Sequence, residues 1–323
     1  MKNLIVIILV MSTFMLCFPL LAIRENPITA SGNKNTEKEV YTSSLKEDGF
    51  FRVLISSTGE IKEISDEDYI FCVVAAEMPA LYEKEALKAQ AVAAYSFALR
   101  RQAEASGKDY DISTDPSVDQ SYISQEDIKS KWGEKAEEYS EKIRSAVKEV
   151  KGLAVIYKNE VALTLYHAIS CGATESSADI WGGKYSYLSS VDSVWDKLAE
   201  NYLTTKSFTA DELKNKLGKD YSFDKKTSSW IKITEKTKMG SVKKLTLCGK
   251  EISGEELRKA LDLRSLNFTV NFKEDVFTFT VKGYGHGVGM SQNGANYMAK
   301  QGSDFKEILE YYYKGCTVKS VAK

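Results

Sequence analysis

An uncharged apolar run near the amino terminus constrains this chain more than any other feature, because such a run must leave water. Residues 4–22 read LIVIILVMSTFMLCFPLLA. A helix of this length, rising about 1.5 Å per residue, reaches the ~30 Å of a bilayer core. A removable signal peptide, the alternative, normally has a shorter apolar region that ends in small residues. Because Leu20 precedes Ala22 here, we predict a retained single-pass membrane anchor over residues 1–22.

The segment after the apolar run has the composition of a tether. Residues 23–49 are rich in Asn, Thr, Ser, Glu and Lys and show hardly any apolar periodicity, which is typical of a flexible linker. A linker of this length spans roughly 30 Å. Lys2, on the short side of the apolar run, favours an inside amino terminus. We therefore expect residues 50–323 to fold on the extracytoplasmic side of a cell membrane.

Composition excludes several function classes. The chain of 323 residues has 44 Lys and Arg against 45 Asp and Glu, so it lacks the basic footprint of a nucleic-acid-binding protein. None of the five cysteines has the CxxC spacing of a zinc ribbon, and Cys17 lies inside the apolar run. We predict neither a nucleic-acid partner nor a disulfide framework.

Local patterns after residue 50 predict alternating helices and strands. Ser65 offers a helix cap, three acidic residues follow it, and Pro79 ends the helix. The predicted helices cover Asp66–Glu77, 84–105 and a surface-lying amphipathic stretch within 126–150. The predicted strands cover 51–55, Leu153–Tyr157 and 161–170, the last two joined by a turn at Lys158 and Asn159.

The pattern changes near residue 196. Short helical patterns at Ala210–Leu217 and Gly254–Leu261 stand among strands such as 276–281. We interpret residues of about 196–282 as a smaller α+β subdomain inserted between two halves of the larger one. The predicted fold class is α+β, with a helical core, mixed or antiparallel strands, and this inserted subdomain.

A carboxylate ends the first predicted helix, in the sequence AAEMP at residues 75–79. At helical spacing Glu77 shares a face with Val73 and Val74, and that face should be buried. Burial disfavours the charged carboxylate and raises its pKa, which is the property that a general acid needs near neutral pH. The alternative is a helix-terminal Glu that turns to solvent or pairs with Lys84 or Lys88.

One amide interrupts the small apolar face of the second predicted helix. Residues 89–94 read AQAVAA, and Gln90 stands among alanines that would let a neighbouring element approach closely. A buried amide needs a hydrogen-bond partner. The alternative is a Gln that faces solvent on an Ala-rich helix.

Glycines alternate with other residues in GYGHGVG at 283–289. In an extended segment the glycines leave one face without side chains, and Tyr284, His286 and Val288 lie on the other face. A sugar ring would then fit close to the bare backbone. A helix starting near Met290 would add free N–H groups that favour an anion. A turn packed for structural reasons is the alternative.

His167 and Cys171 stand four residues apart, and with His286 they suggest a zinc site or a thiol nucleophile with a histidine base. We favour neither the zinc site nor the thiol nucleophile. The chain has two histidines in all, and His167 shares strand parity with Leu163 and Leu165, as a core histidine would. We predict no metal and no cofactor.

Four motifs follow one another along the chain: AEMP at 76–79, AQAVAA at 89–94, SCGATES at 170–176 with YL and SV behind it, and GHGVGMSQ at 285–292. Together they resemble the domain shared by stage II sporulation protein D and the amidase-enhancer proteins. The resemblance covers residues 50–317. The apolar run and the overall length resemble the sporulation protein more than the larger enhancers.

The resemblance implies that residues 50–323 form a peptidoglycan lytic transglycosylase, a lyase that degrades the cell wall during sporulation and engulfment. Such an enzyme cuts the β-1,4 bond between N-acetylmuramic acid and N-acetylglucosamine in glycan strands, preferably strands stripped of peptides, and leaves 1,6-anhydro ends. Glu77 matches the family's catalytic acid and base. The alternative is a non-catalytic glycan-binding activator of a cell-wall amidase.

The resemblance also implies substrate contacts and partners. The residues that match the motifs as substrate contacts are Gln90, Tyr95, Ser170, Cys171, Thr174, Tyr187, His286, Ser291 and Gln292. The implied partners are glycan strands, the membrane that holds the amino-terminal helix, the amidase stage II sporulation protein P, and stage II sporulation protein M.

The chain departs from the family pattern in two places. Tyr95 and Ser96 stand where the family usually has Arg-Thr, which puts a sugar contact of that arginine in doubt. Residues 111–120 contain neither Cys nor His, whereas some relatives carry a zinc site there. The second departure supports the prediction that no structural zinc is bound.

Overall fold

The computed structural model describes residues 49–321 except 184, 219–220, 222 and 224–226. The predicted anchor at residues 1–22, and the predicted tether apart from Gly49, lie outside these described residues. Within the described part, no helix combines the length and the apolar character that a membrane crossing requires.

The described chain opens with a hairpin that leads into the first helix. Strands β1 (Phe50–Ile55) and β2 (Glu60–Ser65) pair antiparallel, and β3 (Ile112–Ser113) adds to β1 in parallel. Helix α2 (Asp66–Glu77) begins directly after β2. The predicted first strand and first helix are confirmed.

Helix α3 (Lys84–Glu104) runs through the middle of the larger lobe. Helices α2, α5, α9 and α10 and strand β4 all contact it. Alanines at 86, 89, 91, 93, 94 and 98 are buried around its circumference, and their small side chains allow this close approach on several sides. The Ala-rich sequence of α3 thus reflects its central position.

The predicted helix within 126–150 is not one helix. The structure divides it into α4 (Ile128–Trp132), a 3₁₀ turn at Gly133–Lys135 and α5 (Ala136–Glu149). Gly133 adopts φ of 56° and ψ of −128°, which breaks the helical path. The predicted amphipathic character is confirmed, because Ile143 and Val147 are buried against the core while the charged residues of α5 are not.

The strands after α5 are shorter than predicted. β4 (Leu153–Tyr157) pairs with β5 (Glu160–Val161) and with β14 (Thr317–Ser320), and the turn residues Lys158 and Asn159 both have positive φ. The predicted hairpin is therefore confirmed. The predicted strand over 161–170 is wrong in its extent, because after β5 only β6 (Tyr166–His167) forms, in parallel with β13 (Met290–Ser291).

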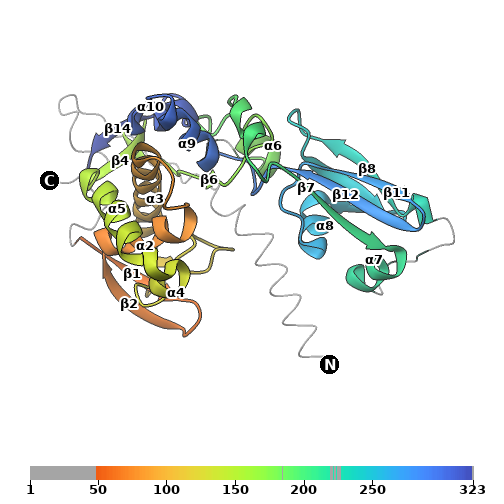
Figure 1. Cartoon of the computed structure of the whole chain (residues 1–323), viewed down its shortest axis with the longest axis horizontal. Coiled ribbons are helices and arrows are strands. Elements are labelled where there is room, and N and C mark those ends of the chain that lie inside the picture. Colours follow the sequence, from red (N-terminus) through yellow and green to blue (C-terminus); the bar gives the residue numbers. More distant parts are fainter. Residues whose placement is uncertain (1–48, 184, 219–220, 222, 224–226, 322–323) are drawn as a thin grey trace.

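A second lobe follows helix α6 (Ser177–Trp181) and the 3₁₀ turn η2 (Val194–Leu198). It has two three-stranded antiparallel sheets, ordered β11-β12-β7 and β10-β9-β8, and a hydrophobic cluster of its own. Figure 1 shows it beside the helical lobe. Its elements are β7 (Leu203–Thr209), α7 (Ala210–Leu217), η3 (Thr227–Ser229), β8 (Ile231–Lys236), β9 (Val242–Leu247), β10 (Lys250–Ser253), α8 (Gly254–Leu261), β11 (Phe268–Lys273) and β12 (Val276–Lys282).

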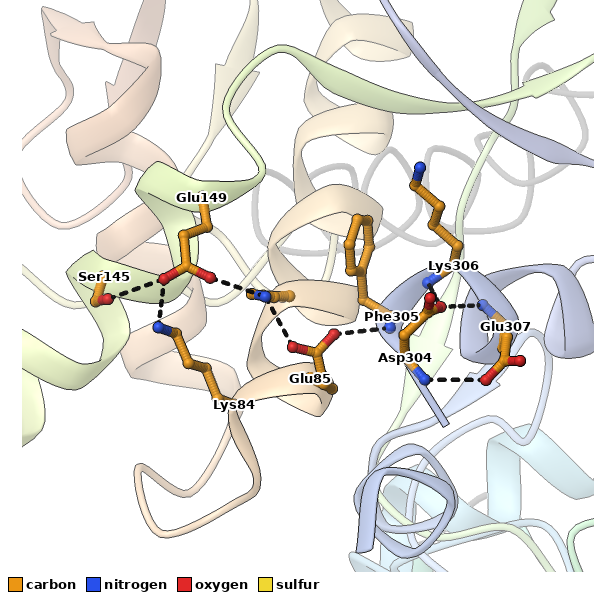
Figure 2. Close-up of polar contacts among 9 residues, drawn as sticks. Lys84, Glu85, Ser145, Glu149, Asp304, Phe305, Lys306 and Glu307 are labelled. Carbon is orange, nitrogen blue, oxygen red and sulfur yellow. Dashed lines mark hydrogen bonds and ion pairs between the residues drawn. The ribbon is translucent and has the colours of Figure 1, made fainter. Parts of the chain in front are cut away.

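The chain then returns to the helical lobe with α9 (Gln292–Lys300) and α10 (Phe305–Tyr312). Figure 2 shows how charged groups join three helix ends there. Glu149 of α5 bonds Lys84 and Lys88 of α3, and Glu85 of α3 accepts from the backbone N–H of Phe305 at 3.0 Å. Helices and strands thus share both lobes, and the predicted α+β class is confirmed.

Candidate active site

The local sequence places Glu77 at the end of α2. Ser65 caps the start of this helix, since its side chain accepts from the N–H of Asp68 at 3.1 Å. At the other end Met78, directly before Pro79, is extended with φ of −114° and ψ of 144°. Glu77 is therefore the last helical residue, and its side chain stands at the point where the chain leaves the helix.

The Glu77 side chain is half-buried, and its carboxyl accepts a hydrogen bond from the backbone. Its Oε1 accepts from the backbone N–H of Ser121 at 2.9 Å. Burial raises the pKa of Glu77 above its ordinary value, while hydrogen bonds from Ser121 and Gln292 and the charge of Lys131 act in the opposite direction. Glu77 thus has the environment of an acid that keeps its proton to higher pH than a free Glu.

Two glutamines from distant parts of the chain meet beside Glu77. Gln90 of α3 is fully buried, and its Oε1 accepts from Nε2 of Gln292, the first residue of α9, at 3.3 Å. Nε2 of Gln90 and the hydroxyl of Tyr166 lie close to each other, and neither has another hydrogen-bond partner within the described structure. The structure therefore brings together three predicted site residues and adds Tyr166 to them.

The polar groups at the start of α9 form hydrogen bonds within the protein. Ser291 is fully buried and caps the helix by accepting from the N–H of Gly294 at 3.2 Å. The N–H of Asn293 donates to the Ala168 carbonyl at 3.0 Å. Two of the N–H groups that were predicted to be free for an anion are therefore bonded within the protein.

The loop at 170–176 is held by a buried carboxylate that the sequence did not indicate. Oδ2 of Asp196 accepts from the N–H of Ser170 at 3.0 Å, and Oδ1 accepts from Nδ2 of Asn293 at 2.9 Å. Asp196 is fully buried. It therefore joins the loop to the start of α9.

Two other predicted contacts in this loop serve the loop itself. The Thr174 hydroxyl accepts from the N–H of Val191 at 2.9 Å. The Cys171 thiol lies near the carbonyls of Ala173 and Met239, and burial raises its pKa. A thiol with a raised pKa is a poor nucleophile at neutral pH, so the structure gives no support to a cysteine mechanism.

The alternating glycines make room for the protein itself and not for a ligand. Gly283, Gly285, Gly287 and Gly289 all have positive φ, between 75° and 105°. A Cβ would lie 2.6 Å from the Ile169 carbonyl at Gly283 and 2.8 Å from His167 Cβ at Gly285, and at Gly289 it would collide with the Leu165 carbonyl. The expectation of open space along this face is wrong, because the segment of residues 165–175 fills it.

His286 of the glycine-rich segment and His167 of β6 lie side by side. Their ring centroids are 5.8 Å apart, and His286 also lies 5.3 Å from the Trp181 ring. Nδ1 of His286 accepts from the N–H of Val288 at 3.1 Å, and His167 Nδ1 lies 3.1 Å from the Val288 carbonyl. Burial lowers the pKa of His167 to about 4 and that of His286 to about 3. Both rings are therefore neutral at physiological pH.

Two predicted contacts do not join the Glu77 group. Tyr187 is buried against Tyr157, with ring centroids 4.7 Å apart, and its hydroxyl accepts from the N–H of Leu163. Tyr95 packs against Phe51 at 6.2 Å and lies near the start of α2, close to Asp66. Glu77 is eleven residues further along α2, or about 16 Å.

Some residues of the site carry no signal in the sequence. Ser121 and Lys131 reach Glu77 from a loop and from a short helix, and neither belongs to a motif. The sequence does carry one signal for Tyr166. It directly precedes the core residue His167 in a predicted strand, so the two side chains should point to opposite faces. Among the described residues, no three His, Cys, Asp or Glu side chains gather so as to hold a metal ion.

With this geometry established, similarity to known proteins becomes informative. The model of a family described as stage II sporulation protein matches residues 55–157. Stage II sporulation protein D of Bacillus subtilis (strain 168) is 38% identical over 261 residues, which cover 80% of this chain and 75% of that protein.

The chain belongs to the stage II sporulation protein D family. The protein of the same name from Bacillus amyloliquefaciens is 35% identical over 81% of this chain and 76% of its own length. A more distant relative, the amidase enhancer of Bacillus subtilis, is 26% identical over 77% of this chain and 40% of its own length. Family membership makes this chain a sporulation protein, and the family resemblance expected from the four motifs is confirmed.

Proposed function

We propose that this family member is a lytic transglycosylase that cleaves the bond between N-acetylmuramic acid and N-acetylglucosamine in peptidoglycan. The observation that supports this most is the half-buried Glu77 carboxyl, whose pKa burial raises. A general acid must hold a proton near neutral pH and remain accessible to substrate. The raised pKa of Glu77 favours the first requirement, and its side chain is not fully buried.

In the proposed reaction Glu77 acts first as acid and then as base. Its carboxyl protonates the leaving glycosidic oxygen as the bond from the muramic acid C1 breaks. The resulting carboxylate accepts the proton of the C6 hydroxyl as O6 bonds to C1. The products are a 1,6-anhydro ring and a free N-acetylglucosamine hydroxyl, no water is consumed, and Glu77 regains its proton.

The surroundings of Glu77 suit this chemistry better than ordinary hydrolysis. A glycoside hydrolase generally uses a second carboxylate to activate water or to attack the sugar. Within the described structure, the resolved partners of Glu77 are Ser121, Gln292 and Lys131. None of these is a carboxylate, whereas the sugar's own hydroxyl supplies the nucleophile in a transglycosylase.

The proposal includes a location and partners. The apolar run at residues 4–22 would anchor the chain in the cell membrane, with the catalytic domain on the extracytoplasmic side beside the wall. A preference for peptide-stripped strands requires an amidase that removes the peptides first. Stage II sporulation protein P would supply that activity, with stage II sporulation protein M at the same membrane.

Product analysis tests the proposed reaction. Purified full-length protein in detergent is incubated with glycan strands already stripped of stem peptides, and the ends are analysed by mass spectrometry. We expect new 1,6-anhydro-muramyl ends, which are lighter than hydrated ends by one water molecule because the proposed reaction consumes no water. Hydrated reducing ends alone would show a hydrolase.

A second candidate function follows from the relative named amidase enhancer. In that case the chain would bind glycan strands without cutting them and stimulate an amidase. The same incubation distinguishes the two functions, since a pure activator releases no glycan ends from stripped strands. It would instead increase the rate at which an added amidase frees peptides from intact peptidoglycan.

A further inference from the structure

Lys131 reaches the end of α2 although it belongs to another helix. Its Nζ donates to the carbonyls of Ala75 at 2.7 Å and Ala76 at 3.1 Å, in the last turn before Glu77. Helix α2 has no basic residue in its own last turn. Because the carbonyl end of a helix carries partial negative charge, the cation of Lys131 compensates the helix end that bears the Glu77 carboxyl.

The position of Lys131 is fixed by its neighbours in α4. Ile128, at the start of that short helix, is buried in the core. Trp132 packs edge-on against Tyr139 with ring centroids 5.7 Å apart, and Gly133 then turns the chain away. Lys131 thus extends toward α2 from a segment anchored on both sides.

We propose that Lys131 is a positioning residue that holds the end of α2 and sets the pH range over which Glu77 keeps its proton. The kinetic consequence of this inference rests on the proposed function, but its electrostatic part does not. The two charges act on each other: Lys131 lowers the pKa of Glu77 against the effect of burial, and Glu77 raises that of Lys131 against burial.

The other titratable groups that face Glu77 stay uncharged. Tyr69 on α2 and Tyr166 on β6 are close enough for the Glu77 charge to raise their pKa values, which burial already holds well above the ordinary range. Ser121 and Gln292 contribute hydrogen bonds without charge. Among the described residues, Lys131 is therefore the cation whose charge acts on this carboxyl, against the larger effect of burial.

Lys142 offers a matched control. Its Nζ donates to the carbonyl of Tyr82 at 2.7 Å, so it too joins a later helix to the segment between α2 and α3. It is not among the main groups that act on Glu77. Replacing either lysine by Met removes one such contact, but only Lys131→Met removes the charge beside Glu77.

The test is a carbon-13 NMR titration of the Glu77 carboxyl in the detergent-solubilised full chain, with the signal assigned by its absence in Glu77→Gln. We expect Lys131→Met to raise the midpoint by roughly half to one pH unit. Lys131→Arg keeps the charge and should restore the wild-type midpoint, and Lys142→Met should leave it unchanged. An unchanged midpoint in Lys131→Met, or an equal shift in Lys142→Met, would overturn the proposal.

The dependence of kcat/KM on pH then links the titration to turnover. Because protonated Glu77 is the proposed acid, activity falls as pH rises through its pKa, and Lys131→Met should move this alkaline limb upward by the same amount. A shifted titration with no glycan cleavage at any pH would support the role of Lys131 and contradict the transglycosylase. A shifted titration with an unmoved limb would overturn the kinetic part of the proposal.

Discussion

The end of α2 and the glycine-rich segment respond to burial in opposite ways. Burial raises the pKa of Glu77, so the carboxyl keeps its proton to higher pH than a free Glu, whereas burial lowers the pKa values of His167 and His286, so the rings are neutral at physiological pH. Both regions therefore avoid charge, but only Glu77 is left with an acidic proton to donate. The difference identifies Glu77, and neither histidine, as the candidate acid.

The two regions also differ in how their backbones are used. At the end of α2 the Glu77 side chain is only partly buried, although burial is the main cause of its raised pKa. At the glycine-rich segment the faces of Gly283, Gly285 and Gly289 are covered by residues 165–170. The first region therefore carries the candidate acid, and the second is closely packed against the preceding segment.

The largest expected effect breaks the packing of the second region. Gly289→Ala places a Cβ against the Leu165 carbonyl at a φ of 76°, and we expect it to cost at least about 4 kcal/mol of stability or to prevent folding. Gly302→Ala is the control, because its φ of 96° is also positive but no atom lies within 4 Å of the new Cβ. That change should cost about 1–2 kcal/mol. Urea unfolding compares them.

A different outcome would revise the comparison of the two regions. If Gly289→Ala were as stable as Gly302→Ala but had lost glycan binding, the glycine faces would serve a ligand. The segment would then belong to the substrate site.

A medium effect concerns the neutral histidines. The pKa of His167 is about 4 in the folded protein against an ordinary 6.5, so the unfolded chain binds the proton more tightly and stability is lost as pH falls from about 6.5 toward 4. At pH 4.5 this loss amounts to about 2 kcal/mol. His167→Gln has no such proton to bind.

We therefore expect wild-type protein to lose about 2 kcal/mol more than His167→Gln between pH 7 and pH 4.5. Urea unfolding at the two pH values measures this difference, and the other titrating groups cancel in the comparison. Equal losses in both proteins would mean that His167 is not held neutral by burial.

The smallest expected effect is a change in kcat/KM when one of two tyrosines loses its hydroxyl. Tyr166 lies close enough to Glu77 for the carboxylate charge to raise its pKa, and its hydroxyl lies beside the amide of Gln90. Tyr166→Phe should therefore lower kcat/KM about 10-fold, or roughly 1.4 kcal/mol. Tyr95→Phe should change it less than about twofold, because Tyr95 lies near the other end of α2. A larger loss in Tyr95→Phe would extend the site to that end of the helix.

The sequence predicted best what depends on local contacts. The bounds of α2 follow from the Ser65 cap and the Pro79 stop, and those of α7 and α8 follow from capping boxes at Thr209 and Ser253. The prediction for 161–170 erred because β6 is limited by its partner, Met290–Ser291, which lies far along the chain. Strand length set by such a distant partner leaves no local signal.

The candidate site shows the same division. Glu77, Gln90 and Gln292 were predicted from motifs, and the structure brings them together. Lys131 and Asp196 act through tertiary contacts that no spacing rule encodes. The alternating glycines were recognised as a place of close approach, but which atoms approach is decided by the fold of residues 165–175.

Replacing Glu77 tests the central claim most directly. Glu77→Gln keeps the shape of the side chain and still accepts from the N–H of Ser121, so we expect a melting temperature close to that of wild type. Cleavage of peptide-stripped glycan strands, followed by mass spectrometry of 1,6-anhydro ends, should fall by at least about 1,000-fold, because an amide cannot donate and recover the proton. Full cleavage by a folded Glu77→Gln would contradict the assignment of Glu77 as the acid and base.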